Sequence, residues 1–155
     1  MIQGKTIFIT GGAGFIANTL IKHYISNNNI VVYDNFHRDT LSSSEVAHHQ
    51  NLKVVKGDVL DYEFLKESMK GADIVVHAAG IAGIDTVIKD PVKTMRVNMI
   101  GTSNALEAAR ENGVTDRFID FSTSEIFGSM AYKSTEADNT VSGSAGEARD
   151  RKSVV

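Results

Sequence analysis

Cysteine is absent from this 155-residue chain, which also has no tryptophan and a single proline. Without thiols the chain can form neither disulfides nor cysteine-ligated metal sites. The histidines show no spacing typical of metal ligands, and the adjacent pair at 48 and 49 is better explained as solvated surface. We therefore expect no metal site. The five histidines are His23, His37, His48, His49 and His77.

Long hydrophobic runs and an excess of positive charge are also lacking. No apolar run approaches the roughly 20 residues that a membrane-spanning helix needs. The net charge of -3 gives no general electrostatic reason to bind nucleic acid or an anionic membrane. Met1 leads directly into the first apolar run, so no signal peptide is expected. These observations predict a cytoplasmic protein with neither nucleic acid nor membrane as a partner.

Short apolar runs alternate with longer segments of helical periodicity. Runs rich in β-branched residues are typical of strands buried on both faces of a parallel sheet. Strands that alternate with helices predict right-handed βαβ units and an α/β fold with a doubly wound parallel sheet. We expect five strands, at residues 7–9, 30–33, 52–55, 74–77 and 117–121, with helices behind residue 14, near 62–69 and over about 92–112.

The character of the chain changes after Gly128. Residues 129–153 are rich in Ser, Gly, Thr, Glu and Asp and have only scattered apolar side chains. Such a composition does not supply enough apolar surface for a packed element. We therefore expect residues 1–128 to form the domain and residues 129–155 to be a loop or disordered tail.

A glycine-rich turn follows the first apolar run, in the segment "ITGGAGFIA". Gly11 permits a sharp turn out of the strand, and Gly14 permits a pyrophosphate to approach the backbone at the start of a helix. The helix N-terminus offers free N–H groups and a positive dipole end to the diphosphate. By itself this pattern is also compatible with a purely structural turn.

Acidic residues end the next two strands. Asp34 follows the glycines by about 20 residues, where a carboxylate can accept both hydroxyl hydrogens of an adenosine ribose. The same carboxylate would repel a 2′-phosphate, which favours NAD over NADP, although the nearby Arg38 weakens that preference. Asp58 ends the third strand, where its side chain or the amide of Val59 could contact adenine, or where Asp58 could instead cap a helix starting near Leu60.

Small residues close the fourth strand. Ala78, Ala79 and Gly80 follow His77 and leave room for a flat cofactor over the strand ends. The same small side chains could equally serve close packing of a helix on the sheet.

Taken together, these motifs resemble the extended short-chain dehydrogenases, and within them the NAD-dependent epimerase/dehydratase group that acts on nucleotide sugars. The resemblance runs from residue 4 to about 149 and implies NAD as cofactor, a UDP-, GDP- or dTDP-sugar as substrate and a homodimeric parent protein. It adds Phe15, Ile16, Asn35, Asn98 and Ser122 to the expected cofactor contacts. Ala17 stands where the family usually has a third glycine. The motifs are Thr10–Ile16, Asp34-Asn35, Gly57-Asp58-Val59, His77-Ala78-Ala79, Asn98 with Gly101-Thr102, and Ser122–Gly128.

The resemblance also implies catalytic residues. The family uses a Ser or Thr hydroxyl, a tyrosine, and a lysine four residues after that tyrosine, to move a proton while hydride passes to NAD. Thr123 matches the hydroxyl, and Ser124 and Glu125 match second-step acid/base positions, in a form closer to decarboxylases and dehydratases than to simple 4-epimerases. These residues could also only cap a strand end.

The tyrosine and lysine of that set are missing after Thr123. Tyr132 is followed directly by Lys133, and position 136 is Glu. The last six residues, 150–155, match no family continuation, and the codons GAT CGG AAG AGC GTC GTG that would encode them look like a sequencing adapter read in frame. We therefore expect an N-terminal fragment with a non-native end that is inactive alone. A non-catalytic NAD-binding regulator and a short binding module are the alternatives.

Overall fold

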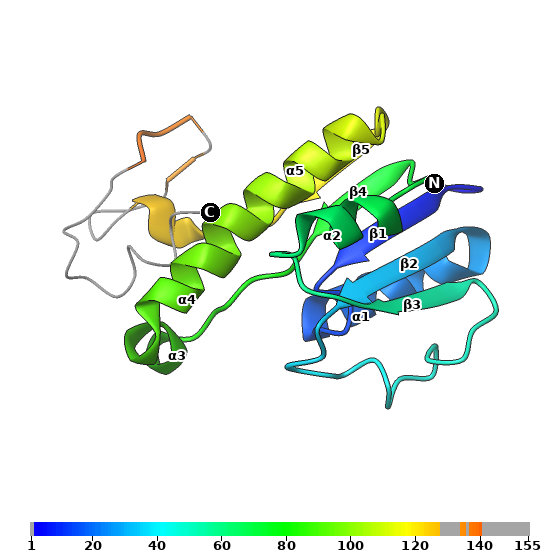
Figure 1. Cartoon of the computed structure of the whole chain (residues 1–155), viewed down its shortest axis with the longest axis horizontal. Coiled ribbons are helices and arrows are strands. Elements are labelled where there is room, and N and C mark those ends of the chain that lie inside the picture. Colours follow the sequence, from blue (N-terminus) through cyan, green and yellow to red (C-terminus); the bar gives the residue numbers. More distant parts are fainter. Residues whose placement is uncertain (1, 128–133, 136, 141–155) are drawn as a thin grey trace.

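The computed structural model describes residues 2–127, 134–135 and 137–140. Its strands form one sheet, which is covered by helices (Figure 1). Five strands lie in the order β3-β2-β1-β4-β5, and every neighbouring pair is parallel. β1 is central, so the chain moves outward first to one side of it and then to the other. The predicted α/β doubly wound parallel sheet is confirmed.

The strand positions follow the apolar runs closely. The strands are β1 (Thr6–Thr10), β2 (Asn29–Asp34), β3 (Leu52–Lys56), β4 (Ile74–His77) and β5 (Arg117–Asp120). Burial on both faces holds for β1 and β4, but the prediction is wrong for β3 and β5, which are largely exposed. These two strands form the edges of the described sheet, so each has a neighbouring strand on one side only.

One face of the sheet packs against helix α1 (Phe15–Tyr24), which continues into the 3-10 turn η1 (Ile25–Asn27). Alternate side chains of the strands point to this face, because successive residues of a strand face opposite sides. Ala17 and Ile21 of α1 meet Ile7 and Ile9 of β1 in this cluster. Ala17 is 1% exposed, so the residue at the third glycine position lies in the helix–sheet contact.

The other face packs against helices α2 (Tyr62–Ser68) and α5 (Gly101–Glu111). Phe8 and Tyr33 are fully buried there, and their ring centroids lie 5.8 Å apart. The small side chains of Ala105 and Ala108 let α5 approach the sheet closely. Apolar burial of this kind contributes about 25 cal/mol per Å² and supplies most of the stability of such a layer.

The long helix expected over about 92–112 is present but is not uniform. It consists of α4 (Pro91–Met95), a π-helical turn η2 (Arg96–Ile100) and α5, and it follows the short α3 (Ile84–Lys89). Figure 1 shows the α4 end extending past the sheet. Ile100 and Leu106 are 47% and 49% exposed, whereas Ala105, Ala108 and Ala109 are buried. The sheet thus contacts the alanine side of the helix.

Few residues of the predicted tail are described. A turn joins Thr135 to Asp138, whose carboxylate accepts a hydrogen bond from the Thr135 amide at 2.6 Å. Residues 128–133, 136 and 141–155, with the segment expected to be non-native, lie outside the described residues. Within the described part of the chain, no helix is long and apolar enough to cross a bilayer.

Candidate functional site

The glycine turn has the geometry expected of a close backbone approach. Gly11 follows β1 with φ +66°, a region that favours glycine. A Cβ built on Gly11 would lie 2.6 Å from the backbone of both Ala78 and Ala79. The Gly11 amide donates to the Tyr33 carbonyl at 2.9 Å, which ties the turn to β2. Gly11 therefore lets three strand ends meet.

Gly14 is the N-cap of α1 and places free N–H groups at the edge of the sheet. Its amide donates to the Gly11 carbonyl at 3.0 Å. Among the described residues, the amides of Phe15 and Ile16 have no carbonyl acceptor, as expected of the first turn of a helix. The side chains of Phe15 and Ile16 are 79% and 57% exposed. This arrangement fits a diphosphate at the helix N-terminus.

Asp34 ends β2 and faces the glycine turn. Its Oδ2 accepts from the Ala13 amide at 3.0 Å, and its Oδ1 accepts from the Phe36 amide at 2.7 Å. Phe36 has φ +61°, an uncommon conformation for a residue with a side chain. Asn35 accepts from the His37 amide at 3.0 Å. The carboxylate is thus held by two backbone donors and keeps lone pairs for further donors.

A contact that sequence reasoning missed joins the glycine turn to the segment after β2. The Ala13 carbonyl accepts from both the amide and the hydroxyl of Thr40, at 2.8 and 2.9 Å. Asn18 of α1 donates to the Thr40 carbonyl at 3.2 Å and accepts from the Ser44 hydroxyl at 2.9 Å. The only sequence signal was a polar, Ser/Thr-rich segment between two strands, which does not specify a partner.

Asp58 and Val59 follow β3 and make different contacts. Asp58 accepts from the Leu60 amide at 3.0 Å in a local turn. The helix starts at Tyr62 and is capped by Asp61, so the alternative of Asp58 as a helix cap near Leu60 is wrong. The Val59 side chain is buried against α5, and its amide has no acceptor among the described residues. That amide remains available to a ligand.

Tyr33 of β2 contacts the segment at Gly57 and Asp58 that follows β3. Its hydroxyl donates to the Asp58 carbonyl at 2.9 Å, and its ring lies within 2.5 Å of where a Cβ on Gly57 would be. Burial, with smaller contributions from the carboxylates of Asp61 and Asp58, raises the pKa of Tyr33 to about 12. The phenol therefore stays protonated in the folded chain under ordinary conditions.

This raised pKa predicts an alkaline loss of stability that Tyr33→Phe removes. The unfolded tyrosine ionises near pH 10 and the folded one near 12, so the wild-type free energy of unfolding falls as the pH rises through this window. Below pH 10, the wild type should exceed Tyr33→Phe by about 1 kcal/mol because of the hydroxyl bond. Urea denaturation of both proteins between pH 8 and 11 measures the difference. Parallel pH curves would show that Tyr33 does not titrate in this way.

The segment after β4 is held from two sides. The Ala78 amide donates to the Thr10 carbonyl at 3.0 Å, and the Ala79 amide donates to the Thr10 hydroxyl at 3.3 Å. Asn98 in η2 is 5% exposed and binds Ile81 twice, accepting from its amide at 2.8 Å and donating to its carbonyl at 3.1 Å. Both polar groups of the Asn98 side chain thus hold this loop, and direct contact with cofactor stays a prediction.

The predicted catalytic segment follows β5. Ser122 is exposed and Thr123 is half-buried, and the Thr123 carbonyl accepts from the Ile126 amide at 3.3 Å at the start of the 3-10 turn η3 (Ser124–Phe127). Ser124 and Glu125 belong to this turn, and their side chains lie outside what the structure describes. Their roles remain predictions.

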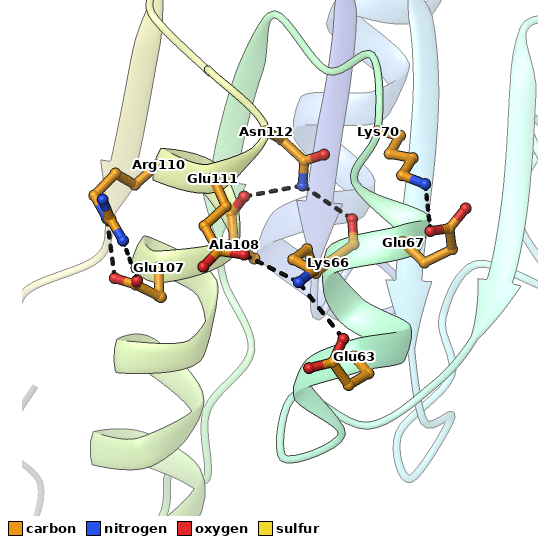
Figure 2. A network of polar contacts seen from close by, with 9 residues as sticks. All are labelled: Glu63, Lys66, Glu67, Lys70, Glu107, Ala108, Arg110, Glu111 and Asn112. Atoms are coloured by element: carbon orange, nitrogen blue, oxygen red, sulfur yellow. Dashed lines mark hydrogen bonds and ion pairs between the residues drawn. The ribbon is translucent and has the colours of Figure 1, made fainter.

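A tyrosine with a lysine four residues later does occur on α2, well before Thr123 in the chain. The Lys66 Nζ lies 5.3 Å from the centre of the Tyr62 ring. Figure 2 shows Lys66 between α2 and α5, paired with Glu111 at 3.0 Å and Glu63 at 3.5 Å, while Asn112 donates to the Lys66 carbonyl. Tyr62 and Lys66 therefore belong to the contact between two helices on one face of the sheet, and they do not lie with the predicted residues at the ends of the strands.

The predicted residues thus gather at one edge of the molecule. Carboxyl ends of parallel strands lie along the same edge of a sheet, and ligands of open α/β sheets bind there. The glycine turn follows β1, Asp34 ends β2, Asp58 follows β3, Ala78 and Ala79 follow β4, and Ser122 and Thr123 follow β5. The arrangement places backbone donors, the Asp34 carboxylate and a close backbone approach along one edge of the sheet.

Comparison with known proteins agrees with this geometry. The family described as NAD dependent epimerase/dehydratase matches residues 7–147. A UDP-N-acetylglucosamine 4,6-dehydratase (inverting) from Campylobacter jejuni is 32% identical over 117 residues, covering 74% of this chain and 35% of that protein. A UDP-glucose 4-epimerase from Rickettsia typhi is 32% identical over 121 residues, covering 74% of this chain and 36% of that protein.

The fold of a solved structure is similar over nearly the whole chain. The enzyme WbmH of Bordetella bronchiseptica, in complex with NAD+, has a TM-score of 0.82 and 25% identity, covering 98% of this chain and 50% of that one. The family is NAD-dependent, and the NAD cofactor expected from the sequence is confirmed at this level. The chain spans little more than a third of the length of the two curated relatives above.

Proposed function

Because this chain belongs to the NAD-dependent epimerase/dehydratase family, we propose that it forms the cofactor-binding half of an enzyme that modifies a nucleotide sugar. The observation that carries the proposal is the glycine turn at Gly11 and Gly14 facing Asp34, with free amides at the start of α1. The α1 N-terminus would hold the diphosphate, and Asp34 would hold the adenosine ribose. Asp58 and Val59 after β3, Ala78 to Gly80 after β4 and Ser122 after β5 would complete the cofactor surface.

The proposed reaction begins with oxidation of the sugar at C4. When bound, NAD would supply the hydride acceptor. Thr123, at the end of β5, would orient the C4 hydroxyl by hydrogen bonding, and Ser124 and Glu125 would act in a later acid/base step of a dehydratase or decarboxylase. The resemblance implies a tyrosine that accepts the hydroxyl proton and a lysine that assists it, and neither is found at the required spacing after Thr123. This chain alone is therefore proposed to bind NAD without turnover.

The test separates binding from chemistry. Isothermal titration calorimetry of the 155-residue chain with NAD should give saturable binding, while a panel of UDP-, GDP- and dTDP-sugars should give no NADH absorbance. Turnover by the chain alone would overturn the assignment of a half-site. The absence of NAD binding would overturn the cofactor role.

A second test uses a longer protein that contains this chain. A Tyr-x-x-x-Lys sequence with sugar turnover would support the proposal of an enzyme, and the absence of that sequence would favour a non-catalytic NAD-binding regulator.

We also propose that the long helix mediates a homodimer. Its exposed apolar side chains recur at helical spacing along one side, which a soluble monomer seldom leaves uncovered. Met95 and Met99 are 41% and 42% exposed, and Val92 and Leu106 extend the row. A second copy of the same helix would bury this row against itself.

Introducing charge into the row should separate the two copies. The double variant Met95→Glu and Met99→Glu should sediment as a monomer where the wild type sediments as a dimer, because two carboxylates per copy would face each other in an apolar contact. Val54→Glu, which adds the same charge at a 46% exposed valine on β3, serves as control and should stay dimeric. A wild-type chain that sediments as a monomer at tens of micromolar would contradict the proposal.

A further inference from the structure

His77 bridges three elements of the fold. It ends β4, is 1% exposed, and has both ring nitrogens within hydrogen-bond distance of a hydroxyl. The Nδ1 lies 2.7 Å from the Thr10 Oγ1 on β1, and the Nε2 lies 3.1 Å from the Thr102 Oγ1 on α5. A buried imidazole satisfied on both sides connects the centre of the sheet to the long helix.

The direction of each hydrogen bond follows from its neighbours. The Thr102 hydroxyl donates to the Asn98 carbonyl at 2.6 Å, so its oxygen accepts the hydrogen of the His77 Nε2. The Nδ1 of a neutral imidazole is then an acceptor, and the Thr10 hydroxyl donates to it. The same Thr10 oxygen accepts from the Ala79 amide at 3.3 Å. One continuous chain therefore runs from Ala79 through Thr10, His77 and Thr102 to Asn98.

The surroundings keep this imidazole neutral. Burial lowers the pKa of His77, and the carboxylate of Asp120 on β5, the charged group that acts on it, opposes this only partly. The Phe118 ring of β5 stacks on the imidazole with centroids 6.4 Å apart. A second proton on the Nδ1 would take the place of the Thr10 hydrogen and would charge an apolar site.

Both ends of the chain of hydrogen bonds attach to the loop after β4. At one end the Thr10 oxygen fixes the Ala79 amide next to Gly11, and at the other end Asn98 holds Ile81 by two bonds. The loop after β4 is therefore held at its start through β1 and further along through η2. His77 is the group that couples these two attachments.

We propose that His77 is a positioning residue for the dinucleotide site: the neutral imidazole, with its hydrogen on Nε2, holds the loop after β4 in the conformation that binds the cofactor. The proposal rests on the NAD-binding function proposed above. His77 itself, buried below the loop, would not contact the cofactor and would act through Thr10 and Thr102.

The experiment replaces threonines by valine or serine, because these side chains are close to threonine in shape. Thr102→Val removes the acceptor of the His77 Nε2 hydrogen, whereas Thr102→Ser keeps it. Thr94→Val is the matched control, because the buried Thr94 hydroxyl makes the same type of bond to a carbonyl four residues back, at 2.8 Å, with no histidine attached. We would measure NAD affinity by calorimetry and hydrogen exchange of the Ala79 amide by NMR without NAD.

Thr102→Val should bind NAD about tenfold more weakly than wild type, as expected for the loss of one buried hydrogen bond, and its Ala79 amide should exchange faster. Thr102→Ser and Thr94→Val should match the wild type in both measurements. If Thr102→Val binds NAD as well as Thr94→Val does, the positioning role is overturned. If the wild type binds no NAD, the proposed function fails, and the proposed role of His77 fails with it, although faster Ala79 exchange would still show the coupling.

Discussion

Replacing Gly11 by alanine should destabilise this protein by about 3 kcal/mol or more and abolish NAD binding. Two costs add at this position. A side chain at φ +66° costs about 1–2 kcal/mol, and the new Cβ would lie 2.6 Å from the Ala78 and Ala79 backbone, where overpacking costs about 1–3 kcal/mol more. Backbone cannot move aside as a flexible side chain can. The displaced strand ends would no longer bind a diphosphate.

Gly113→Ala separates the two costs. Gly113 follows α5 with φ +67°, almost the same conformation, but nothing lies within 4 Å of its added Cβ. It should lose only about 1 kcal/mol and keep its NAD affinity. Urea denaturation gives the free energies of unfolding, and calorimetry gives the affinities. Equal losses in the two variants would show that the close approach of Ala78 does not determine the need for glycine.

Removing the carboxylate of Asp34 should weaken NAD binding about 100-fold. Each charge-assisted hydrogen bond to the ribose contributes about 1.5–3 kcal/mol, so two of them account for at least this factor. Asp34→Ala also removes the acceptor of the Ala13 and Phe36 amides, which loosens the glycine turn. Because the repulsion of a 2′-phosphate is lost as well, the preference for NAD over NADP should shrink.

Asp39→Ala provides the control for this carboxylate. Asp39 lies five residues later, accepts from the Leu41 and Ser42 amides at 3.0 Å, and has its pKa lowered chiefly by the Ser42 hydroxyl. Its loss should leave the affinities for NAD and NADP unchanged. Thermal unfolding of both variants checks that each is folded. An Asp34→Ala protein with wild-type NAD affinity would contradict the assignment of the ribose site.

Much of the fold could be predicted because its signals are local. The apolar runs at β1, β2 and β4 and the glycines behind β1 specify elements through periodicity and backbone freedom, which depend on a few neighbouring residues. Burial could not be read in the same way. Ile100 and Leu106 are apolar but exposed, because the alanine side of α5 faces the sheet, and the edge position of β3 leaves Val54 open.

The sequence by itself determined the α/β class, the alternation of strands and helices, and the residue types at each strand end, since these follow from composition and short-range spacing. Only the tertiary structure decided which distant residues share a contact. The contact of Thr40 with the Ala13 carbonyl and the position of His77 between Thr10 and Thr102 depend on chain segments brought together by the sheet. Hydrogen bonding requires distances near 3 Å, and no sequence spacing encodes such a distance across 25 or 67 residues.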